Sequence, residues 1–501
     1  MLAASSVVIG SVDACIVVAY LVATILLGIW LGRGQKNNRE YFLGGHQLPT
    51  WSLLLSIVAT ETSTVTFLSV PGLSYIKDRN FTFLQLAFGY IVGRMAIIVF
   101  LLPGYFRGEM LSAYEVLGQR FGLATRRLAS LVFLVMRNLA DGLRLLLSAM
   151  ALKLAIDLNV YECIIVMTII TAVYCCAGGV RSVVWNDCIQ FAVYMAGAFA
   201  TVWVIVHLVS GGWGQIVQFG HETGRWQVFD FDPSLTKKTV TFWSGLVGGA
   251  FLTLATHGAD QMIVQRYLCA KNQKSASWAL GISGFIVLGQ FALFLTIGLA
   301  LACFYSVHDT ASAPTSGDQV FMTFVVQHMG TGLTGLILAA ILAATMSNLS
   351  SSFNSSASVF MSDWLQRWLP TMADRESLRL ARWLTLMFAG LHALVAITAY
   401  KMAFDESTVN MVLGIAGFST GLLLGLYFLG LIAPNTREAV AIVAFFVGLA
   451  VTCGVAFGTR ISWCWYTLIG SMVVVIVGIV LGIFFKRPAS GSPVASYHRL
   501  A

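Results

Sequence analysis

Residues 51–72 read WSLLLSIVATETSTVTFLSVPG, an apolar segment with a polar centre. Its length is about that of a helix crossing the ~30 Å hydrocarbon core of a bilayer. Hydroxyl and carboxyl side chains predominate from Ala59 to Thr66. Because Ser and Thr compete for backbone hydrogen bonds, we expect the helix to unwind there. Unwound backbone in a membrane lines a cavity or binds a ligand; the alternative is a Ser/Thr face for helix packing.

The composition of the whole chain is that of an integral membrane protein. Of 501 residues, 58% are hydrophobic and 10% charged, against about 25% charged in soluble domains. The even spread of apolar runs predicts a single transmembrane domain over residues 1–487 and a disordered tail over 488–501. The first apolar run is too long for a signal peptide. Nine cysteines without a Cys-x-x-Cys pair indicate neither a zinc site nor a disulfide framework.

The predicted fold class is all-α, with about thirteen transmembrane helices. Their approximate limits are 13–31, 50–75, 83–105, 128–155, 161–177, 182–209, 240–264, 278–305, 333–364, 380–400, 409–432, 439–457 and 465–485. Two longer outer loops, 211–238 and 306–330, separate some of them, and residues 318–328 could form a short surface helix.

The distribution of basic residues predicts the orientation of these spans. With the N-terminus outside, about two thirds of the 30 Lys and Arg residues fall in inner segments and about a quarter in outer ones. We therefore expect an outer N-terminus and a cytoplasmic C-terminus in the cell membrane. The same bias explains the net charge of +8 without a nucleic-acid partner.

A second interruption is predicted in the seventh span, where residues 255–261 read ATHGADQ. It lies five spans after the first interruption. A pair of broken hydrophobic segments at matching positions is typical of transporters built from inverted repeats. The alternative is that residues 258–261 are simply where the helix leaves the membrane.

The ninth span carries a stripe of neutral oxygens. Residues 343–356 read AATMSNLSSSFNSS, in which Ser347, Asn348, Ser351 and Ser355 recur at helical spacing. Hydroxyl, amide and carbonyl oxygens are the ligands that a small hard cation prefers, whereas a soft metal would prefer Cys or His. Together with the first interruption, the stripe favours an ion site over small residues for close helix packing.

A few charged residues lie inside predicted spans. Asp141 and Arg144 are three apart in the fourth span and share a helix face, with Arg137 shortly before them and Arg94 in the third span. Asp141–Arg144 is either a structural ion pair or a pair in which Arg144 faces the cavity and binds an anion, since Arg pairs bidentately with carboxylates.

Four motifs in order resemble those of the sodium:solute symporter family. They are Leu102-Pro103-x-Tyr105 with the following 112–122 segment, Gly178-Gly179 with Trp185-Asn186-Asp187, Asp260-Gln261 with Gln265-Arg266, and the ninth span from Ala344 to Asp363. The resemblance implies a LeuT-like fold: a core of two inverted five-helix repeats, about 48–209 and 240–432, with one extra helix before it and two after. It also implies uptake of a small solute coupled to inward sodium flow by alternating access.

The resemblance further implies a sodium site at the first interruption. The expected ligands are the carbonyls of Ala59, Thr62 and Ala344 and the side chains of Ser347 and Asn348. The family usually has Ser or Thr where this chain has Asn348, so an amide oxygen would replace a hydroxyl. Asp187 matches an acidic residue that serves a second cation in some members, which leaves a second sodium open.

Six residues are candidates for contact with the solute: Glu61, Ser63, Thr66, Asp141, Arg144 and Gln261. Arg144 resembles an arginine that meets the substrate carboxylate in the sialic-acid branch. Glu61 could accept a hydroxyl or amine of the solute, pair with Arg144, or carry a proton. An anionic solute such as a sugar acid, sialic acid or monocarboxylate is therefore expected.

Other functions remain as alternatives. A symporter of a neutral sugar or amino acid would use the same fold, and so would a membrane sensor, although the short C-terminal tail disfavours a signalling subunit. An enzyme is not expected, because neither Gly-x-Ser-x-Gly nor His-Glu-x-x-His is present. The expected partners are the solute, sodium as the only cofactor-like ion, and the lipid bilayer; a monomer is the simplest expectation.

Overall fold

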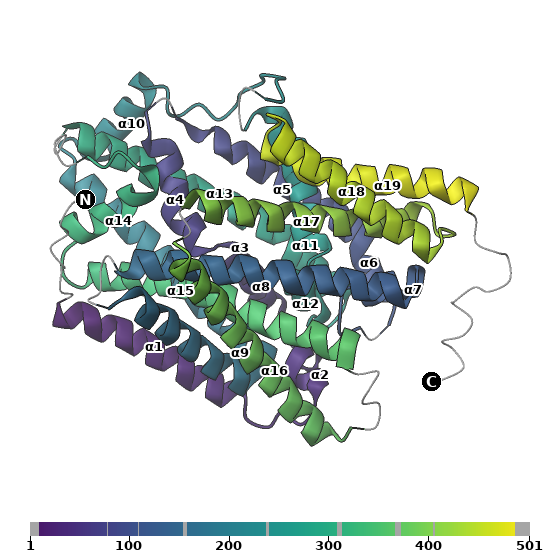
Figure 1. The fold of residues 1–501 in the computed structure, drawn as a ribbon. Helices are drawn as coiled ribbons and strands as arrows, with labels where there is room; N and C mark the ends of the chain where they lie inside the picture. Colours follow the sequence, from purple (N-terminus) through teal and green to yellow (C-terminus); the bar gives the residue numbers. More distant parts are fainter. Residues whose placement is uncertain are drawn as a thin grey trace.

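A computed structural model describes residues 10–77, 79–108, 110–153, 158–236, 240–307, 313–365, 372–403 and 406–485. These residues form helices and no sheet, and most of the long helices run from left to right in Figure 1. The helices are α1 (Ser11–Leu31), α2 (Asn38–Leu43), α3 (Thr50–Glu61), α4 (Thr64–Tyr75), α5 (Leu84–Ala96), α6 (Leu102–Tyr105), α7 (Glu115–Arg120), α8 (Leu123–Lys153), α9 (Val160–Leu208), α10 (Gly212–Glu222), α11 (Gly249–Gly258), α12 (Gln261–Leu268), α13 (Gln273–Val307), α14 (Gly317–His328), α15 (Leu333–Phe360), α16 (Asp374–Lys401), α17 (Glu406–Ile432), α18 (Glu438–Gly458) and α19 (Tyr466–Phe484).

The all-α membrane class is confirmed. Among the described residues, eight helices are long and apolar enough to cross a membrane, and the bent pair α3–α4 would be a ninth. The count of thirteen spans stays a prediction, because two predicted spans lie within α9 alone, which is 49 residues long. The α8 helix does not pass the same test, since Arg137, Asp141 and Arg144 lie in its middle.

A glycine joins the two segments of α9. Gly179 adopts φ 52° and ψ −149° inside the helix, a conformation that residues with a Cβ rarely adopt. A Cβ at this position would also meet the backbone carbonyl of Tyr41. The predicted break between the fifth and sixth spans therefore depends on a glycine both for its backbone angles and for its close approach to α2.

The predicted interruption of the second span is present. α3 ends at Glu61, α4 begins at Thr64, and the two parts of the span are bent by 62°. Thr62 is extended, and the Ser63 side chain caps α4 by accepting a hydrogen bond from the Thr66 N–H. The same hydroxyl groups that favoured unwinding in the sequence thus begin the second half of the helix.

The seventh span is also interrupted rather than simply ended. α11 stops at Gly258 and α12 starts at Gln261, with Asp260 in an extended conformation and its carboxylate accepting from the Met262 N–H. Every residue of α12 is buried. The alternative that residues 258–261 lead directly out of the helical bundle is therefore wrong.

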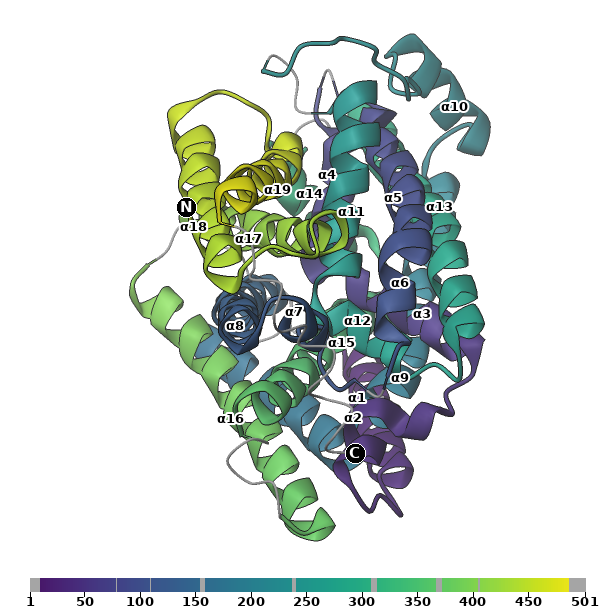
Figure 2. The ribbon, with the colours of Figure 1, turned by 90° about the vertical axis from the view of Figure 1, so that its right-hand side faces the viewer.

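The α15 helix forms the centre of the molecule. All residues from Ile337 to Val359 are buried, and the helix packs against α1, α3, α8, α9 and α16. Figure 2, which looks along the long helices, shows α8, α9 and α16 around it. The polar stripe of α15 therefore faces other helices, so its oxygens must bind one another, neighbouring helices or a ligand.

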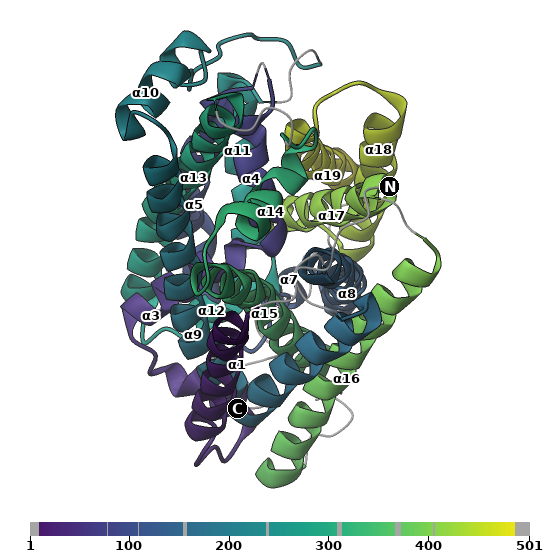
Figure 3. The same ribbon diagram turned by 90° about the vertical axis from the view of Figure 1, so that its left-hand side faces the viewer.

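The last three helices lie at one edge of the bundle. α18 and α19 pack against each other and against α17, and Figures 2 and 3 show all three on the side away from α1. The division into repeats at 48–209 and 240–432 stays a prediction. The tail predicted over 488–501 lies outside the described residues.

The two predicted outer loops contain helices α10 and α14. The expected helix near residues 318–328 is present as α14, but it packs against α4 rather than lying on the surface. The rings of Phe321 and Phe67 have centroids 5.3 Å apart, and both side chains are fully buried. This loop therefore contributes to the core.

Close packing between α13 and α4 yields a first prediction. A Cβ on Gly298 would collide with the Pro71 carbonyl and the Ser74 hydroxyl. Gly298→Ala should therefore lower the melting temperature, with a loss of about 1–3 kcal/mol, as is usual for overpacking. Gly289→Ala is the matched control, because it lies in the same helix with open space around its Cβ. Equal melting temperatures for the two variants would contradict the close contact.

Candidate functional site

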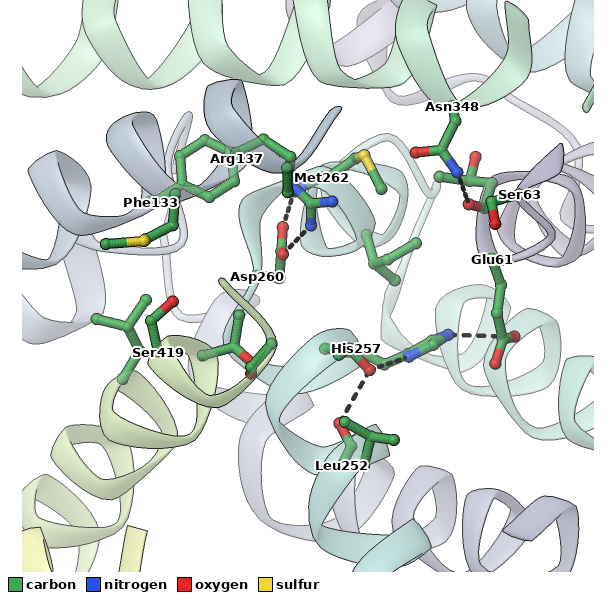
Figure 4. A pocket seen from close by; sticks show the side chains of 18 of the residues that line it. Glu61, Ser63, Phe133, Arg137, Leu252, His257, Asp260, Met262, Asn348 and Ser419 are labelled. Carbon is green, nitrogen blue, oxygen red and sulfur yellow. Dashed lines mark hydrogen bonds and ion pairs between the residues drawn. The ribbon is translucent and has the colours of Figure 1, made fainter. Parts of the chain in front are cut away.

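A cavity of about 280 Å³ lies between the two interrupted spans. Its walls come from the α3–α4 break, α5, α8, the α11–α12 break, α15 and α17. Figure 4 shows Glu61 and Ser63 of the first break, and His257 and Asp260 of the second, around this space. The two interruptions, distant in the sequence, therefore border one cavity.

The end of α3 leaves backbone carbonyl groups without helical partners. Within the described residues, no backbone N–H donates to the carbonyls of Ala59 or Thr62. The Thr60 carbonyl accepts from the side-chain amide of Asn348 at 3.1 Å. The break therefore lies directly against α15, with oxygens available on its surface.

Ser347 and Asn348 supply side-chain oxygens from the α15 side of this contact. The Ser347 hydroxyl donates to Asp187 Oδ1 at 2.6 Å. Asn348 Oδ1 is buried and has no hydrogen-bond partner among the described residues. A buried oxygen without a partner lowers the stability of the fold unless a hydrogen-bond donor or a cation occupies the space beside it. Ala344, the remaining expected ligand, lies one turn earlier in the same helix.

Asp187 has a cationic partner that the sequence did not reveal. Its Oδ2 accepts from the Ser56 hydroxyl at 2.5 Å and lies 3.3 Å from Arg266 Nη2. Arg266 also donates to the hydroxyl groups of Thr60 and Ser351. This carboxylate is therefore hydrogen-bonded and charge-neutralised without a bound ion.

Glu61 pairs with two residues from neighbouring helices. Its Oε2 accepts from the guanidinium of Arg94 in α5 and lies 3.4 Å from Nε2 of His257 in α11. Arg94 is fully buried, and Nη2 of its guanidinium also lies 3.2 Å from His257 Nε2. The alternative that Glu61 pairs with Arg144 is therefore not what the structure shows.

A second group of charges crosses from α8 to the α11–α12 break. Arg137 pairs with Asp260, and its Nη1 lies 3.6 Å from Asp141 Oδ2. Asp141 Oδ1 also accepts from Arg144 at 2.5 Å, so the predicted pair on one helix face is present. The Asp141 side chain is 1% exposed and that of Arg144 32%. Arg137 and Arg144 both line the cavity, and Arg144 is the more exposed of the two and has a single acidic partner among the described residues.

The remaining predicted solute contacts differ in their placement. Ser63 and Thr66 line the cavity, and their hydroxyl oxygens lie 3.1 Å apart. Asp141 does not line this cavity but a small adjoining pocket with Arg144 and Ser63. Gln261 is fully buried outside it, where its amide accepts from the Ala113 N–H and donates to the Leu111 carbonyl. Gln261 therefore holds the loop after α6 and does not line this cavity.

Several residues of the site were not assigned from the sequence. Arg94 and His257 were visible as an intramembrane charge and as the histidine beside a break, but not as partners of Glu61. The α17 residues Ser419 and Thr420, which also line the cavity, gave no signal beyond their polarity. Only the packing of α5, α11 and α17 around the breaks brings them together.

Comparison with known proteins identifies the family to which this helical architecture belongs. A model of the sodium:solute symporter family matches residues 41–448. The chain belongs to the sodium:solute symporter family. Membership makes it a multi-pass transporter that uses sodium as the co-transported ion, and not an enzyme.

Relatives of this symporter cover nearly its whole length. The sodium/sialic acid symporter NanT of Aliivibrio fischeri is 29% identical over 486 residues, 95% of this chain and 94% of the relative. The sodium-coupled monocarboxylate transporter 2 of Danio rerio is 29% identical over 445 residues, 87% of this chain and 70% of the relative. A solved outward-open, substrate-bound sodium-coupled sialic acid symporter superposes with TM-score 0.86 at 26% identity, covering 95% and 98% of the two chains.

The pair between Arg137 and Asp260 gives a prediction for stability. Asp260→Asn retains a side chain that can cap α12 but leaves Arg137 with Asp141 as its sole acidic partner among the described residues. A loss of roughly 3 kcal/mol, near the lower end for broken buried pairs, should appear as a lower melting temperature. Arg137→Gln combined with Asp260→Asn should recover part of the loss. Additive losses in this double-mutant cycle would contradict the pairing.

Proposed function

We propose that this symporter imports a small anionic organic solute with sodium, by alternating access at the cavity between the two interrupted spans. The observation that carries the proposal is Arg144, a partly exposed guanidinium with one acidic partner among the described residues, at a cavity that is also lined by residues of the α3–α4 break. The solutes for which its relatives are named, sialic acid and monocarboxylates, both carry a carboxylate.

The proposed sodium site lies between the end of α3 and α15. Its ligands are the carbonyls of Ala59, Thr62 and Ala344, the Ser347 hydroxyl and Asn348 Oδ1. Support comes from the unpartnered state of the first two carbonyls and of Asn348 Oδ1 among the described residues. These neutral oxygens suit a hard monovalent cation, which needs no carboxylate to bind.

Asp187 is not included in this sodium site. Its two oxygens already accept from Ser347 and Ser56, and Arg266 supplies a positive charge 3.3 Å away. A second sodium at this carboxylate would have to displace the guanidinium. We therefore propose a single sodium ion, bound at the α3–α4 break.

The proposed solute site is the cavity itself. Arg144 would bind the carboxylate of the solute through the guanidinium nitrogens that Asp141 does not use. Ser63 and Thr66 supply hydroxyl groups to the same cavity, and Ser63 also lines a small pocket with Arg144 and the proposed sodium ligand Asn348. Because both sites share the α3–α4 break, an ion that orders this backbone also orders the solute contacts, which couples the two binding events.

The topology and assembly complete the proposal. The distribution of Lys and Arg supports an outer N-terminus and a cytoplasmic C-terminus in the cell membrane. Residues 1–487 are proposed as a single transmembrane unit that works as a monomer in the lipid bilayer. No role for nucleic acid is proposed.

Uptake into proteoliposomes tests this function. With an inward sodium gradient, the protein should accumulate at least one acid from a set of N-acetylneuraminate, gluconate and lactate, because sodium and the carboxylate bind together. Replacing external sodium by choline should abolish accumulation. Sodium-independent uptake would contradict symport, sodium-driven uptake of glucose or proline but of no acid would contradict anion selectivity, and binding without any uptake would favour a sensor.

A further inference from the structure

Glu61 is an unexpected residue in the wall of a cavity that binds anions. Its side chain is 14% exposed and lines the cavity, where a free carboxylate would repel an anionic solute. An apolar side chain at this position would pack better against the chain of an aliphatic acid. The contacts of Glu61 indicate why an acid is tolerated here and what it can do.

The two oxygens of Glu61 are used differently. Oε2 accepts from the Arg94 guanidinium and lies 3.4 Å from His257 Nε2. Oε1 makes no hydrogen bond to any described residue and is not among the buried unpartnered atoms. One carboxylate oxygen is therefore used by the protein and the other is left for the cavity that Glu61 lines; Figure 4 shows the side chain and its His257 contact.

Arg94 removes most of the repulsion that Glu61 would cause. Its side chain is fully buried behind the cavity wall, and Glu61 is its only acidic partner among the described residues. The pair is neutral as a unit, so an anion bound at Arg144 meets no net charge here. What remains on the cavity side is a strong hydrogen-bond acceptor.

His257 holds this acceptor in place through Arg94, from the second interrupted span. Its Nδ1 lies 3.0 Å from the Thr256 hydroxyl, which itself donates to the Leu252 carbonyl at 2.9 Å. This network requires Nδ1–H as the donor, so Nε2 is unprotonated and accepts from Arg94 at 3.2 Å. His257 therefore positions the Arg94 guanidinium, which in turn fixes the rotamer of Glu61 from outside its own helix.

We propose that Glu61 selects solutes that carry neutral hydrogen-bond donors, so that the cavity prefers a hydroxylated acid to an aliphatic monocarboxylate. This inference rests on the proposed binding of the solute carboxylate at Arg144. A hydroxyl group of the solute donates to Glu61 Oε1, whereas a methylene group there leaves the carboxylate oxygen desolvated and unpaired. An ammonium group is disfavoured, because Arg94 already supplies the positive charge beside Glu61.

The expected discrimination follows from the loss of one hydrogen bond to a charged group. Sites built to bind a solute hydroxyl reject the analogue that lacks it strongly, because their polar group is left unpaired. With one partly exposed oxygen, we expect a preference of about 10- to 100-fold. The preference should be lost when the acceptor is removed, while binding of the deoxy acid stays equal or improves.

Matched pairs of acids test this inference on the full-length protein in detergent with sodium. The probes are gluconate against hexanoate and lactate against propionate, with N-acetylneuraminate as an additional hydroxylated acid, and the readout is the dissociation constant from thermal stabilisation. Wild type should bind a hydroxylated acid more tightly than its deoxy partner. Equal or tighter binding of the deoxy partner in every pair would overturn the inference.

The decisive variant replaces both members of the Glu61–Arg94 ion pair at once. Glu61→Leu combined with Arg94→Met avoids leaving a buried charge unpaired, and should reduce the preference for the hydroxylated acid to near unity. Glu222→Gln is the control, because it removes a carboxylate on α10 that lies outside the cavity. An unchanged preference in the double variant would also overturn the inference.

A third variant separates this inference from the proposed function. Arg144→Gln should weaken binding of both members of each pair, because both carry the carboxylate. If no acid binds, or if Arg144→Gln has no effect, the proposed anion site fails. If Arg144→Gln weakens both acids but Glu61→Leu/Arg94→Met leaves their ratio unchanged, only the role of Glu61 fails.

Discussion

The interruption of the second span is the constraint on which the rest of the structure depends. Carbonyl groups released at Ala59 and Thr62 lie deep in a helical bundle, where lipid offers no hydrogen-bond donor. Side chains of neighbouring helices donate hydrogen bonds to residues at this break. Asn348 donates to the Thr60 carbonyl, and Gln290 donates to the Thr62 hydroxyl at 2.6 Å. A bound cation would complete the set of partners, which is why the break and the proposed sodium site coincide.

The charges around the cavity are arranged so that, of the two arginines that line it, Arg144 has the fewer acidic partners among the described residues. Arg94 is balanced by Glu61, and Arg137 by Asp260 and Asp141. Arg144 shares Asp141 with Arg137 and is the most exposed of the three arginines. This arrangement places the Arg144 guanidinium, the proposed carboxylate-binding group, in the cavity without leaving an uncompensated charge in the bundle.

Local patterns in the sequence were enough to predict the breaks and part of the site. The hydroxyl cluster at 59–66 predicted the unwinding because those side chains act on the adjacent backbone, and Asp141–Arg144 followed from spacing within one helix. The pairs Glu61–Arg94, Glu61–His257 and Asp187–Arg266 were not predicted, because each joins separate helices whose packing no local pattern specifies. The contacts of Gln261 were not predicted for the same reason: its motif was recognised, but the loop that binds its amide comes from a distant segment.

Direct binding of radioactive sodium to the purified protein tests the central claim that sodium binds between the break and α15. Wild type should bind sodium saturably, with competition by unlabelled sodium but not by potassium. Asn348→Ala should weaken binding about tenfold or more, as expected for a lost contact to a charged group of about 1.5–3 kcal/mol. Ser355→Ala, a buried serine two turns further along α15, should bind as wild type does. Unchanged sodium affinity in Asn348→Ala would contradict the account.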